Sequence, residues 1–142
     1  MPKRLMLYSR PLGKIAHPRK NQEILEWLEN QLNDGATVVI PEIADYEVRR
    51  SLLLEGLSKS VERLNLLNKV LEYQPITTPT MLRAAELWAE ARKRGIPTAD
   101  PKELDADVIL AAQAEQTDST VVTENVGHLS RFVEAKKWRE IK

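Results

Sequence analysis

Cysteine is absent from this 142-residue sequence, which excludes disulfide bonds and thiolate metal ligands. This composition permits a reducing compartment, and we expect a cytoplasmic protein. Long hydrophobic runs are also missing, and no signal-peptide pattern opens the sequence, so we expect no membrane association. Histidine occurs only as His17 and His128, far apart in the sequence, so a zinc site is a weak interpretation.

Net charge is zero, because 21 acidic residues balance 21 basic ones, and this argues against a surface dedicated to nucleic acid. Acidic residues are nevertheless missing before Glu23. That stretch holds six basic residues: Lys3, Arg4, Arg10, Lys14, Arg19 and Lys20. Two interpretations stay open, namely a basic end of the molecule that contacts phosphates and an ordinary solvated N-terminus.

Short apolar strands alternate with helical patterns along the chain. Strands are expected at 5–7, 37–41, 73–77, 119–123 and 136–141, and helices at 21–35, 41–56, 57–71, 78–95, 104–115 and within 124–132. Pro11 and Gly13 predict a sharp stop after the first strand, and 96–103 is expected to be a loop. This alternation predicts a mostly parallel sheet covered on both faces. No linker divides the chain, so residues 1–142 are expected to form one three-layer α/β/α domain.

Two of the helical patterns predict which side chains face the core. In the helix at 57–71, leucines at three- and four-residue steps, Leu64 among them, form one apolar face. In the helix at 78–95, Thr78 is the expected N-cap, with Pro79 behind it. Met81 and Trp88 are expected on the inner face of that helix.

Acidic residues from three separate segments are placed near the carboxyl edge of the predicted sheet. Glu47 lies in the helix after the second strand, Asp107 lies in the helix at 104–115, and Glu124 follows the strand at 119–123. Carboxylates that converge repel one another and need a cation, a raised pKa or wide spacing. The usual hard cation is Mg²⁺ or Mn²⁺, which commonly serves phosphoryl transfer. Alternatively, Glu47 pairs with Arg50, and Glu124 is a plain loop acid.

Other acidic residues near these three have simpler explanations. Glu42 and Asp105 lie at helix starts, where the helix dipole favours a negative charge. Asp45 is one turn before Arg49, so an ion pair is expected there. Asp107 is two residues after Asp105, which turns a helix by about 200°, so the two carboxylates are expected to point to different sides.

Three stretches resemble the second, third and fourth sequence blocks of PIN-domain nucleases: "IPEIADYEVRRSLL", "LDADVILAAQA" and "VVTENVGHLSRF". The resemblance covers essentially the whole chain, in the family's order. It implies an α/β/α sandwich and cleavage of RNA by an acidic cluster that depends on Mg²⁺ or Mn²⁺. Many bacterial members are toxins of toxin–antitoxin pairs. The resemblance further implies that Glu47, Asp107 and Glu124 are catalytic and hold the metal ion.

The first block departs from the family pattern. That block is normally an apolar strand that ends in aspartate, followed by Ser or Thr and sometimes by "PLG". Here "LMLYSRPLG" has Tyr8 in the position of the aspartate. A neutral phenol is a poor ligand for a hard cation, so weak metal binding and impaired activity are expected. One interpretation is that the Tyr8 ring packs in the site while its hydroxyl bonds to one of the remaining acids.

The resemblance leaves three functional interpretations. The first is a metal-dependent ribonuclease with a degraded site, in which Ser9, Arg10 and Lys14 contact the substrate, although simple solvation also explains Arg10 and Lys14. The second is a non-catalytic PIN module that binds RNA or a protein. The third is a toxin-like subunit whose antitoxin-like partner inserts a residue into the acidic crevice. A homodimer is a further implication of the family alone.

Overall fold

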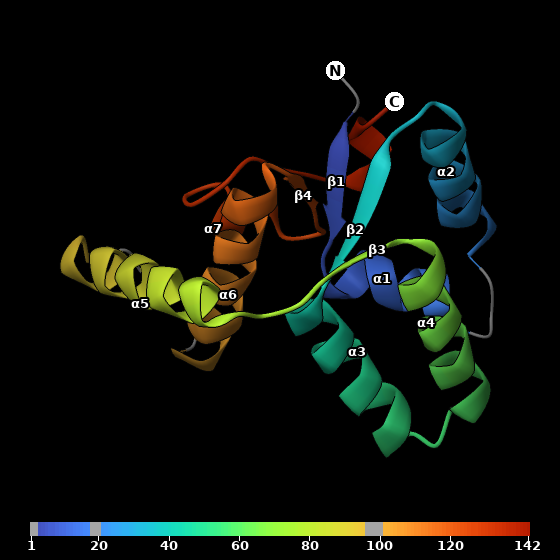
Figure 1. The fold of residues 1–142 in the computed structure, drawn as a ribbon, viewed down its shortest axis with the longest axis horizontal. Coiled ribbons are helices and arrows are strands. Elements are labelled where there is room, and N and C mark those ends of the chain that lie inside the picture. Colours follow the sequence, from blue (N-terminus) through green and yellow to red (C-terminus); the bar gives the residue numbers. More distant parts are fainter. Residues whose placement is uncertain (1–2, 18–20, 96–100) are drawn as a thin grey trace.

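The computed structural model describes residues 3–17, 21–95 and 101–142, so Arg19, Lys20 and the part of the expected loop at 96–100 lie outside the described residues. Five parallel strands form the central sheet, in the order β3-β2-β1-β4-β5 (Figure 1). The strands are β1 (Arg4–Leu7), β2 (Thr37–Pro41), β3 (Glu72–Gln74), β4 (Thr120–Val122) and β5 (Ala135–Lys136). The predicted parallel α/β/α sandwich is therefore confirmed.

Helices cover both faces of the sheet (Figure 1). They are α1 (Ser9–Ala16), α2 (Gln22–Asn33), α3 (Glu42–Leu54), α4 (Ser58–Val70), α5 (Thr78–Lys93), α6 (Pro101–Thr117), α7 (Val126–Leu129) and a 3₁₀ turn (Trp138–Glu140). None of the helices in the described ranges is both long and apolar enough to cross a membrane.

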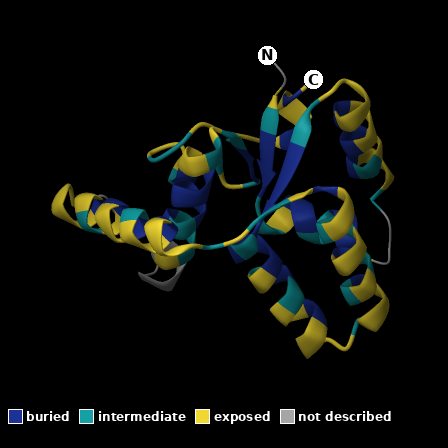
Figure 2. Ribbon diagram, viewed as in Figure 1, coloured by how far each residue is buried: buried dark blue, intermediate teal, exposed yellow. Residues whose placement is uncertain are grey.

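Alternation along β1 divides the core into two layers. Leu5 and Leu7 pack with buried residues of α1, α2, α3 and α4, whereas Met6 between them packs with buried residues of α6 and α7. Successive side chains of a strand point to opposite faces, so one short apolar strand serves both layers. Figure 2 shows the result as buried strands between helices that are buried only on their inner sides. Helix α5 packs on the outer side of α6.

Strand β1 stops at Leu7 as predicted, but the chain then forms helix α1, which the sequence analysis did not expect. Pro11 is the third residue of this helix, in the first turn, where its missing N–H costs no intrahelical bond. At Gly13, an added Cβ would lie 3.9 Å from Cγ2 of Val48 on α3, so the two helices run close together there. Burial of Leu12 and Ile15 stabilises the helix that local propensity disfavours.

Two other predicted boundaries were also displaced. Helix α6 begins at Pro101 rather than at 104, which suits a proline in the first helical position. The expected edge strand at 136–141 is only Ala135–Lys136, followed by the 3₁₀ turn. There Trp138 packs against Trp27 of α2, with ring centroids 6.1 Å apart, and ties the end of the chain to the core.

The start of α5 differs by one residue from the prediction. Thr77, not Thr78, is the N-cap: the Thr80 backbone N–H donates to Thr77 Oγ1 at 3.3 Å, and the Thr77 N–H donates to Thr80 Oγ1 at 3.2 Å. The buried face is also shifted, because Thr80, Ala84, Leu87 and Ala91 face inward. Met81 and Trp88 are partly exposed, so their predicted core positions were wrong.

We expect Thr77→Ala to lower the free energy of unfolding by about 1 kcal/mol, because it removes the oxygen that caps the Thr80 N–H. For a chain of this size that is a drop of roughly 3–5 °C in melting temperature, measurable by circular dichroism. Thr78→Ala is the matched control, since Thr78 is exposed and does not cap α5. Equal losses in the two variants would contradict the assignment of the cap.

The edge strand β3 is tied to the start of α3 by Glu42. The Ile76 backbone N–H donates to Glu42 Oε1 at 2.8 Å, and the Tyr73 hydroxyl donates to Glu42 Oε2 at 3.2 Å. Glu42 is also the first residue of α3, where the dipole favours its charge. The structural role predicted for Glu42 is therefore confirmed.

The raised pKa of the Tyr73 phenol predicts that the protein loses stability at alkaline pH. Burial, followed by the negative charges of Asp45 and Glu42, raises the pKa of Tyr73 to about 12. In the unfolded chain the Tyr73 phenol releases its proton near pH 10. The stabilisation of the folded state by the protonated phenol is therefore complete below about pH 10 and is lost as the pH rises through 12. Chemical denaturation of Tyr73→Phe should show a flatter fall between these pH values, and Tyr46→Phe is the control. An unchanged slope in Tyr73→Phe would refute the assignment.

Candidate functional site

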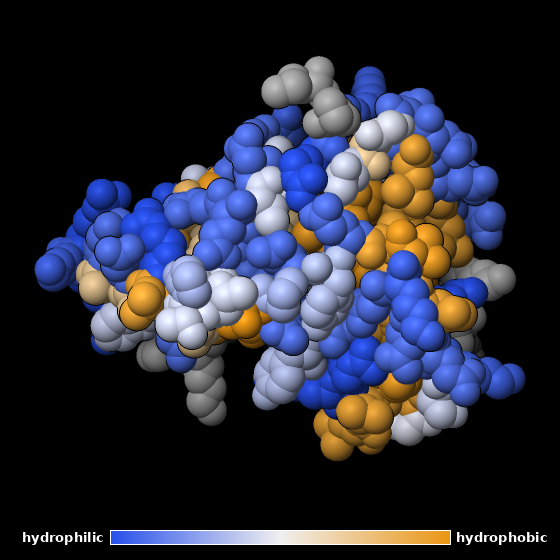
Figure 3. Space-filling model, viewed as in Figure 1, coloured by the Kyte–Doolittle hydropathy of each residue, from blue (hydrophilic) through white to orange (hydrophobic). Residues whose placement is uncertain are grey.

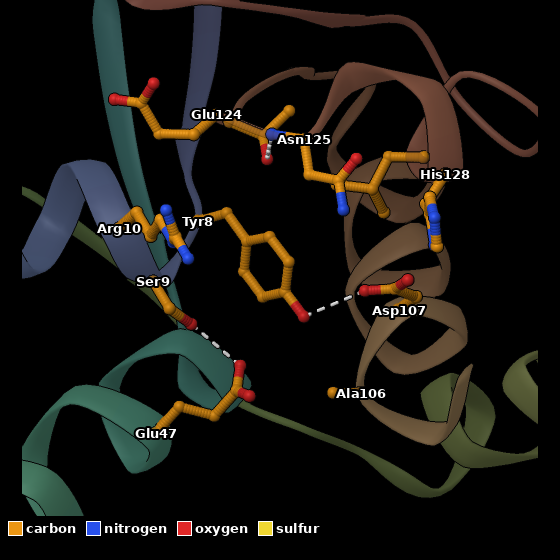
Figure 4. Close-up of a pocket in the computed structure, with 11 residues that line it drawn as sticks. Tyr8, Ser9, Arg10, Glu47, Ala106, Asp107, Glu124, Asn125 and His128 are labelled. Atoms are coloured by element: carbon orange, nitrogen blue, oxygen red, sulfur yellow. Dashed lines mark hydrogen bonds between the residues drawn. The ribbon is translucent and has the colours of Figure 1, made fainter. Parts of the chain in front are cut away.

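A cavity of about 240 Å³ lies beyond the carboxyl ends of β1 and β4 (Figure 4). Its lining residues are Tyr8, Ser9, Arg10, Glu47, Ala106, Asp107, Thr123, Glu124, Asn125, His128 and Leu129. Glu47 comes from α3 and Asp107 from α6, so the predicted convergence of these two acids beside Tyr8 is confirmed. Asp105 does not line this cavity but lies in a groove with Trp88 on the outer side of α6, as the helical phase predicted.

Tyr8 stands at the centre of the cavity. It is the N-cap residue of α1, in extended conformation, and its backbone N–H donates to the Val122 carbonyl at 3.0 Å, which continues the β1–β4 ladder. Its hydroxyl donates to Asp107 Oδ1 at 3.0 Å and lies between the carboxylates of Glu47 and Asp107 (Figure 4). The predicted bond from the phenol to a remaining acid is thus confirmed.

The protonation state of Tyr8 follows from its surroundings. Burial raises the pKa of the Tyr8 phenol far above its ordinary value, and the negative charges of Asp107 and Glu47 raise it further. The phenol therefore stays neutral and acts as a hydrogen-bond donor at every physiological pH. It adds no negative charge to the site.

Glu47 is held from two sides. The Ser9 hydroxyl donates to Glu47 Oε1 at 2.7 Å, and Arg50 Nη2 lies 3.9 Å from Glu47 Oε2. The predicted ion pair with Arg50 exists, but its N···O distance is long and the Arg50 side chain is exposed, so the pair contributes little to stability. The Ser9 bond, made by the first residue of α1, is the shorter contact and directs the carboxylate toward the cavity (Figure 4).

Glu124 turns away from the other two acids. Lys14 Nζ lies 2.8 Å from Glu124 Oε1, and Figure 4 shows the Glu124 carboxylate on the far side of Tyr8 from Asp107. Its hydrogen bond with Lys14 holds the pKa of Glu124 below the usual value, although partial burial opposes the shift. Lys14, expected to contact substrate, is thereby engaged with Glu124.

Three polar residues complete the wall. Arg10 lines the cavity and, in the described part of the chain, makes no hydrogen bond or ion pair. The sequence analysis did not assign Asn125 and His128 to the site. Both follow β4 directly after Glu124, and that proximity to a strand end was the signal that could have identified them.

As arranged here, the three acids do not converge on one point that a divalent cation could occupy. Glu47, Asp107 and Glu124 each accept a hydrogen bond from a different side chain, and the Tyr8 hydroxyl occupies the space between two of them (Figure 4). Among the side chains described, those of residues 3–17, 21–95 and 105–142, no group of three or more His, Asp or Glu is placed to share a metal ion. The metal-binding and catalytic roles of these acids remain predictions.

A second, larger hollow adjoins the cavity. It measures about 520 Å³, lies between α1 and α3, and has Gly13, Val48 and Leu52 among its lining residues. Ser9, Arg10 and Glu47 line both hollows, so the groove leads to the acidic site. Exposed leucines, Leu53 and Leu54, follow at the end of α3, where Figure 3 shows a hydrophobic cluster.

Comparison with known structures finds the same fold in several proteins. One is VapBC2 from Rickettsia felis, whose structure was solved with a DNA fragment from the VapBC2 promoter. It aligns with a TM-score of 0.77 at 18% sequence identity, over 95% of this chain and 98% of that one. FitAB bound to the IR36 DNA fragment gives 0.73 at 23% identity, over 97% of both chains. FitAcB from Neisseria gonorrhoeae gives 0.71 at 23%, over 96% and 99%.

Of the two sequence comparisons, one identifies a family. A comparison with curated proteins found no match. The family described as PIN domain matches residues 14–133, which leaves β1 and Tyr8 just outside the matched range. Members of this family are generally divalent-metal-dependent nucleases. The match spans most of the chain, and together with the parallel sheet and the acids at its carboxyl edge it shows that the chain belongs to the PIN domain family.

Proposed function

We propose that this protein belongs functionally to the ribonuclease class of PIN domains, and that Tyr8 impairs its cleavage of RNA phosphodiester bonds. The bond of 3.0 Å from the Tyr8 hydroxyl to Asp107 is the observation that supports impairment, because it occupies a carboxylate that the reaction would need. The position of Glu47 and Asp107 in one cavity at the carboxyl edge of the sheet supports the assignment to this class.

The proposal gives each residue a role. Glu47 and Asp107, supported by Glu124, are the residues expected to hold Mg²⁺ or Mn²⁺, weakly in the present sequence. When bound, such a cation would supply the positive charge that phosphodiester hydrolysis requires. Arg10 is the best placed residue for a substrate phosphate, because its guanidinium borders the cavity and is unpaired among the described residues.

The test is cleavage of a labelled generic RNA with Mn²⁺ or Mg²⁺ by the natural chain and by Tyr8→Asp. Faster cleavage by the variant supports the proposal. Cleavage by the natural chain at a rate that Tyr8→Asp does not improve would show that the remaining acids suffice and that Tyr8 does not impair the site. Inactivity of both proteins would favour the second candidate.

The second candidate is a non-catalytic module that binds a protein, in particular an antitoxin-like partner. The groove between α1 and α3 favours it, since the groove is larger than the acidic cavity and has the apolar side chains of Val48 and Leu52 in its lining. The similar solved structures include VapBC2 and FitAB, which we take as models for such a pairing.

Co-expression with the product of an adjacent small gene tests the partner. Ser51 lines the groove and is exposed, so Ser51→Arg should prevent co-purification by filling the groove. Asn30→Arg on the exposed side of α2 is the control and should leave co-purification intact. If both variants still retain the partner, it does not bind in the groove.

A further inference from the structure

One short segment of the chain supplies a donor to each of the three acids. The Tyr8 hydroxyl donates to Asp107 at 3.0 Å, the Ser9 hydroxyl to Glu47 at 2.7 Å, and the Lys14 ammonium to Glu124 at 2.8 Å. Glu47 lies on α3, Asp107 on α6 and Glu124 in the loop after β4, at 38, 99 and 110 residues from their donors. A single segment, from the end of β1 into α1, therefore contacts all of them.

The spacing of these donors determines where the acids point. Ser9 begins α1, and Lys14 lies five residues later, more than one helical turn along the axis. Glu124 is consequently drawn along α1, away from the cavity centre, while Tyr8 stands between Glu47 and Asp107 (Figure 4). The three carboxylates are held apart instead of being directed at one point.

Electrostatics explains why this matters. Carboxylates that converge around an empty centre repel, so a site built for a cation is strained without it. In this protein each acid has a hydrogen-bond donor of its own, and one of the donors carries a full positive charge. These donors offset the repulsion between the carboxylates when no ion is bound.

We infer that the segment Tyr8–Lys14 is a built-in substitute for the divalent cation of this acidic site. The hydrogen bonds from this segment stabilise the three carboxylates in the absence of metal. A divalent cation must break these hydrogen bonds before the carboxylates can converge on it. The inference rests on the proposed function in one respect only, that these three acids are the ones a PIN-domain metal would engage. It predicts properties of the metal-free protein that do not depend on RNA cleavage.

The test compares melting temperatures in EDTA and in excess Mn²⁺, together with Mn²⁺ titration calorimetry. The natural protein should melt within about 1 °C in the two buffers, as expected for an ion that adds little binding energy. Tyr8→Asn removes the phenolic donor and the ring but adds no charge. Because the amide oxygen of asparagine is itself a ligand for hard cations, Lys14→Met, which adds no oxygen ligand, must gain Mn²⁺ affinity as well if the released acids are the cause. We expect a melting point lower by roughly 4–8 °C in EDTA, partly restored by Mn²⁺, and an affinity for Mn²⁺ that is higher by about tenfold.

A matched control separates this role from simple packing. Tyr73→Asn removes another phenol that donates to a carboxylate, on Glu42, outside the cavity. This variant should have a lower melting temperature than the natural protein, and Mn²⁺ should not raise it again. Lys14→Met releases Glu124 and keeps the Tyr8 ring, so it provides a milder variant should Tyr8→Asn fold poorly. We expect it to gain a few-fold in Mn²⁺ affinity.

Two outcomes would overturn the inference. One is a natural protein that Mn²⁺ stabilises as much as it stabilises the variants. The other is a set of variants that lose stability in EDTA but bind Mn²⁺ no better than the natural chain, which would reduce these contacts to packing. Neither outcome depends on RNA, so failure here is distinguishable from failure of Tyr8→Asp to cleave.

Discussion

Tyr8→Asp is expected to raise both Mn²⁺ affinity and RNA cleavage by roughly ten- to a hundredfold over the natural chain. The substitution adds a carboxylate to a site whose affinity for a hard cation depends on the number of charges. A unit charge close to the ion is worth about 4 kcal/mol at an effective dielectric of 20. Added repulsion from Glu47 and Asp107 offsets part of that gain, and each 1.4 kcal/mol that remains is about tenfold in affinity.

The same substitution should destabilise the metal-free protein. It removes the hydrogen bond to Asp107 and a ring that packs against both layers of the core. We expect a loss of about 2–3 kcal/mol in EDTA, which Mn²⁺ should largely restore. Calorimetric titration with Mn²⁺, thermal melts and a gel assay on labelled RNA measure the three effects.

Asp107→Asn on the Tyr8→Asp background is the decisive control. It keeps the shape of the site and removes one charge, so both the gained affinity and the gained cleavage should disappear. Persistence of cleavage in this double variant would mean that the activity does not arise from the acids of this cavity. The natural chain carrying Asp107→Asn serves as the baseline.

The largest expected effect on the fold comes from Leu64→Ala in α4. Leu64 is fully buried in the core layer shared by α1, α2, α3 and β1. Truncation removes its packing and leaves a cavity, at a cost of about 3 kcal/mol. For this chain length we expect the melting temperature to fall by roughly 8–12 °C. Leu66→Ala is the matched control two residues away.

Leu66 is 60% exposed, so its truncation should change stability by less than about 0.5 kcal/mol. Chemical denaturation of both variants gives the two free energies directly. Similar losses in the two would show that α4 does not present the face that the leucine spacing predicted. The comparison therefore tests how α4 packs against α1.

Features that depend on neighbours in the sequence were predictable from the sequence alone. The alternation of Leu5, Met6 and Leu7 and the helical spacing around Leu64 are short-range patterns, and each determines an element and its buried face. The separation of Asp105 from Asp107 also follows from helical geometry alone. Helices that lead to the next parallel strand begin at the carboxyl edge of the sheet, so the sequence was enough to predict that Glu47 in α3 and Asp107 in α6 would meet there.

Local signals failed where packing outweighs propensity. Pro11 and Gly13 disfavour a helix after β1, but burial of Leu12 and Ile15 stabilises one there. In α5 the N-cap is Thr77, and separately the buried face is centred on Ala84, Leu87 and Ala91, so Trp88 is partly exposed.

The partners of the acids were decided by the tertiary structure. The sequence predicted that Tyr8 would bond to an acid without indicating which one, and nothing in it predicted that Lys14 would hold Glu124, 110 residues away. Contacts over such separations depend on how α1 lies against α3 and the end of β4, and that is determined by the packing of the whole core. The sequence by itself determined that Glu47 and Asp107 would meet beside Tyr8, and only the fold determined that one segment would satisfy all three carboxylates.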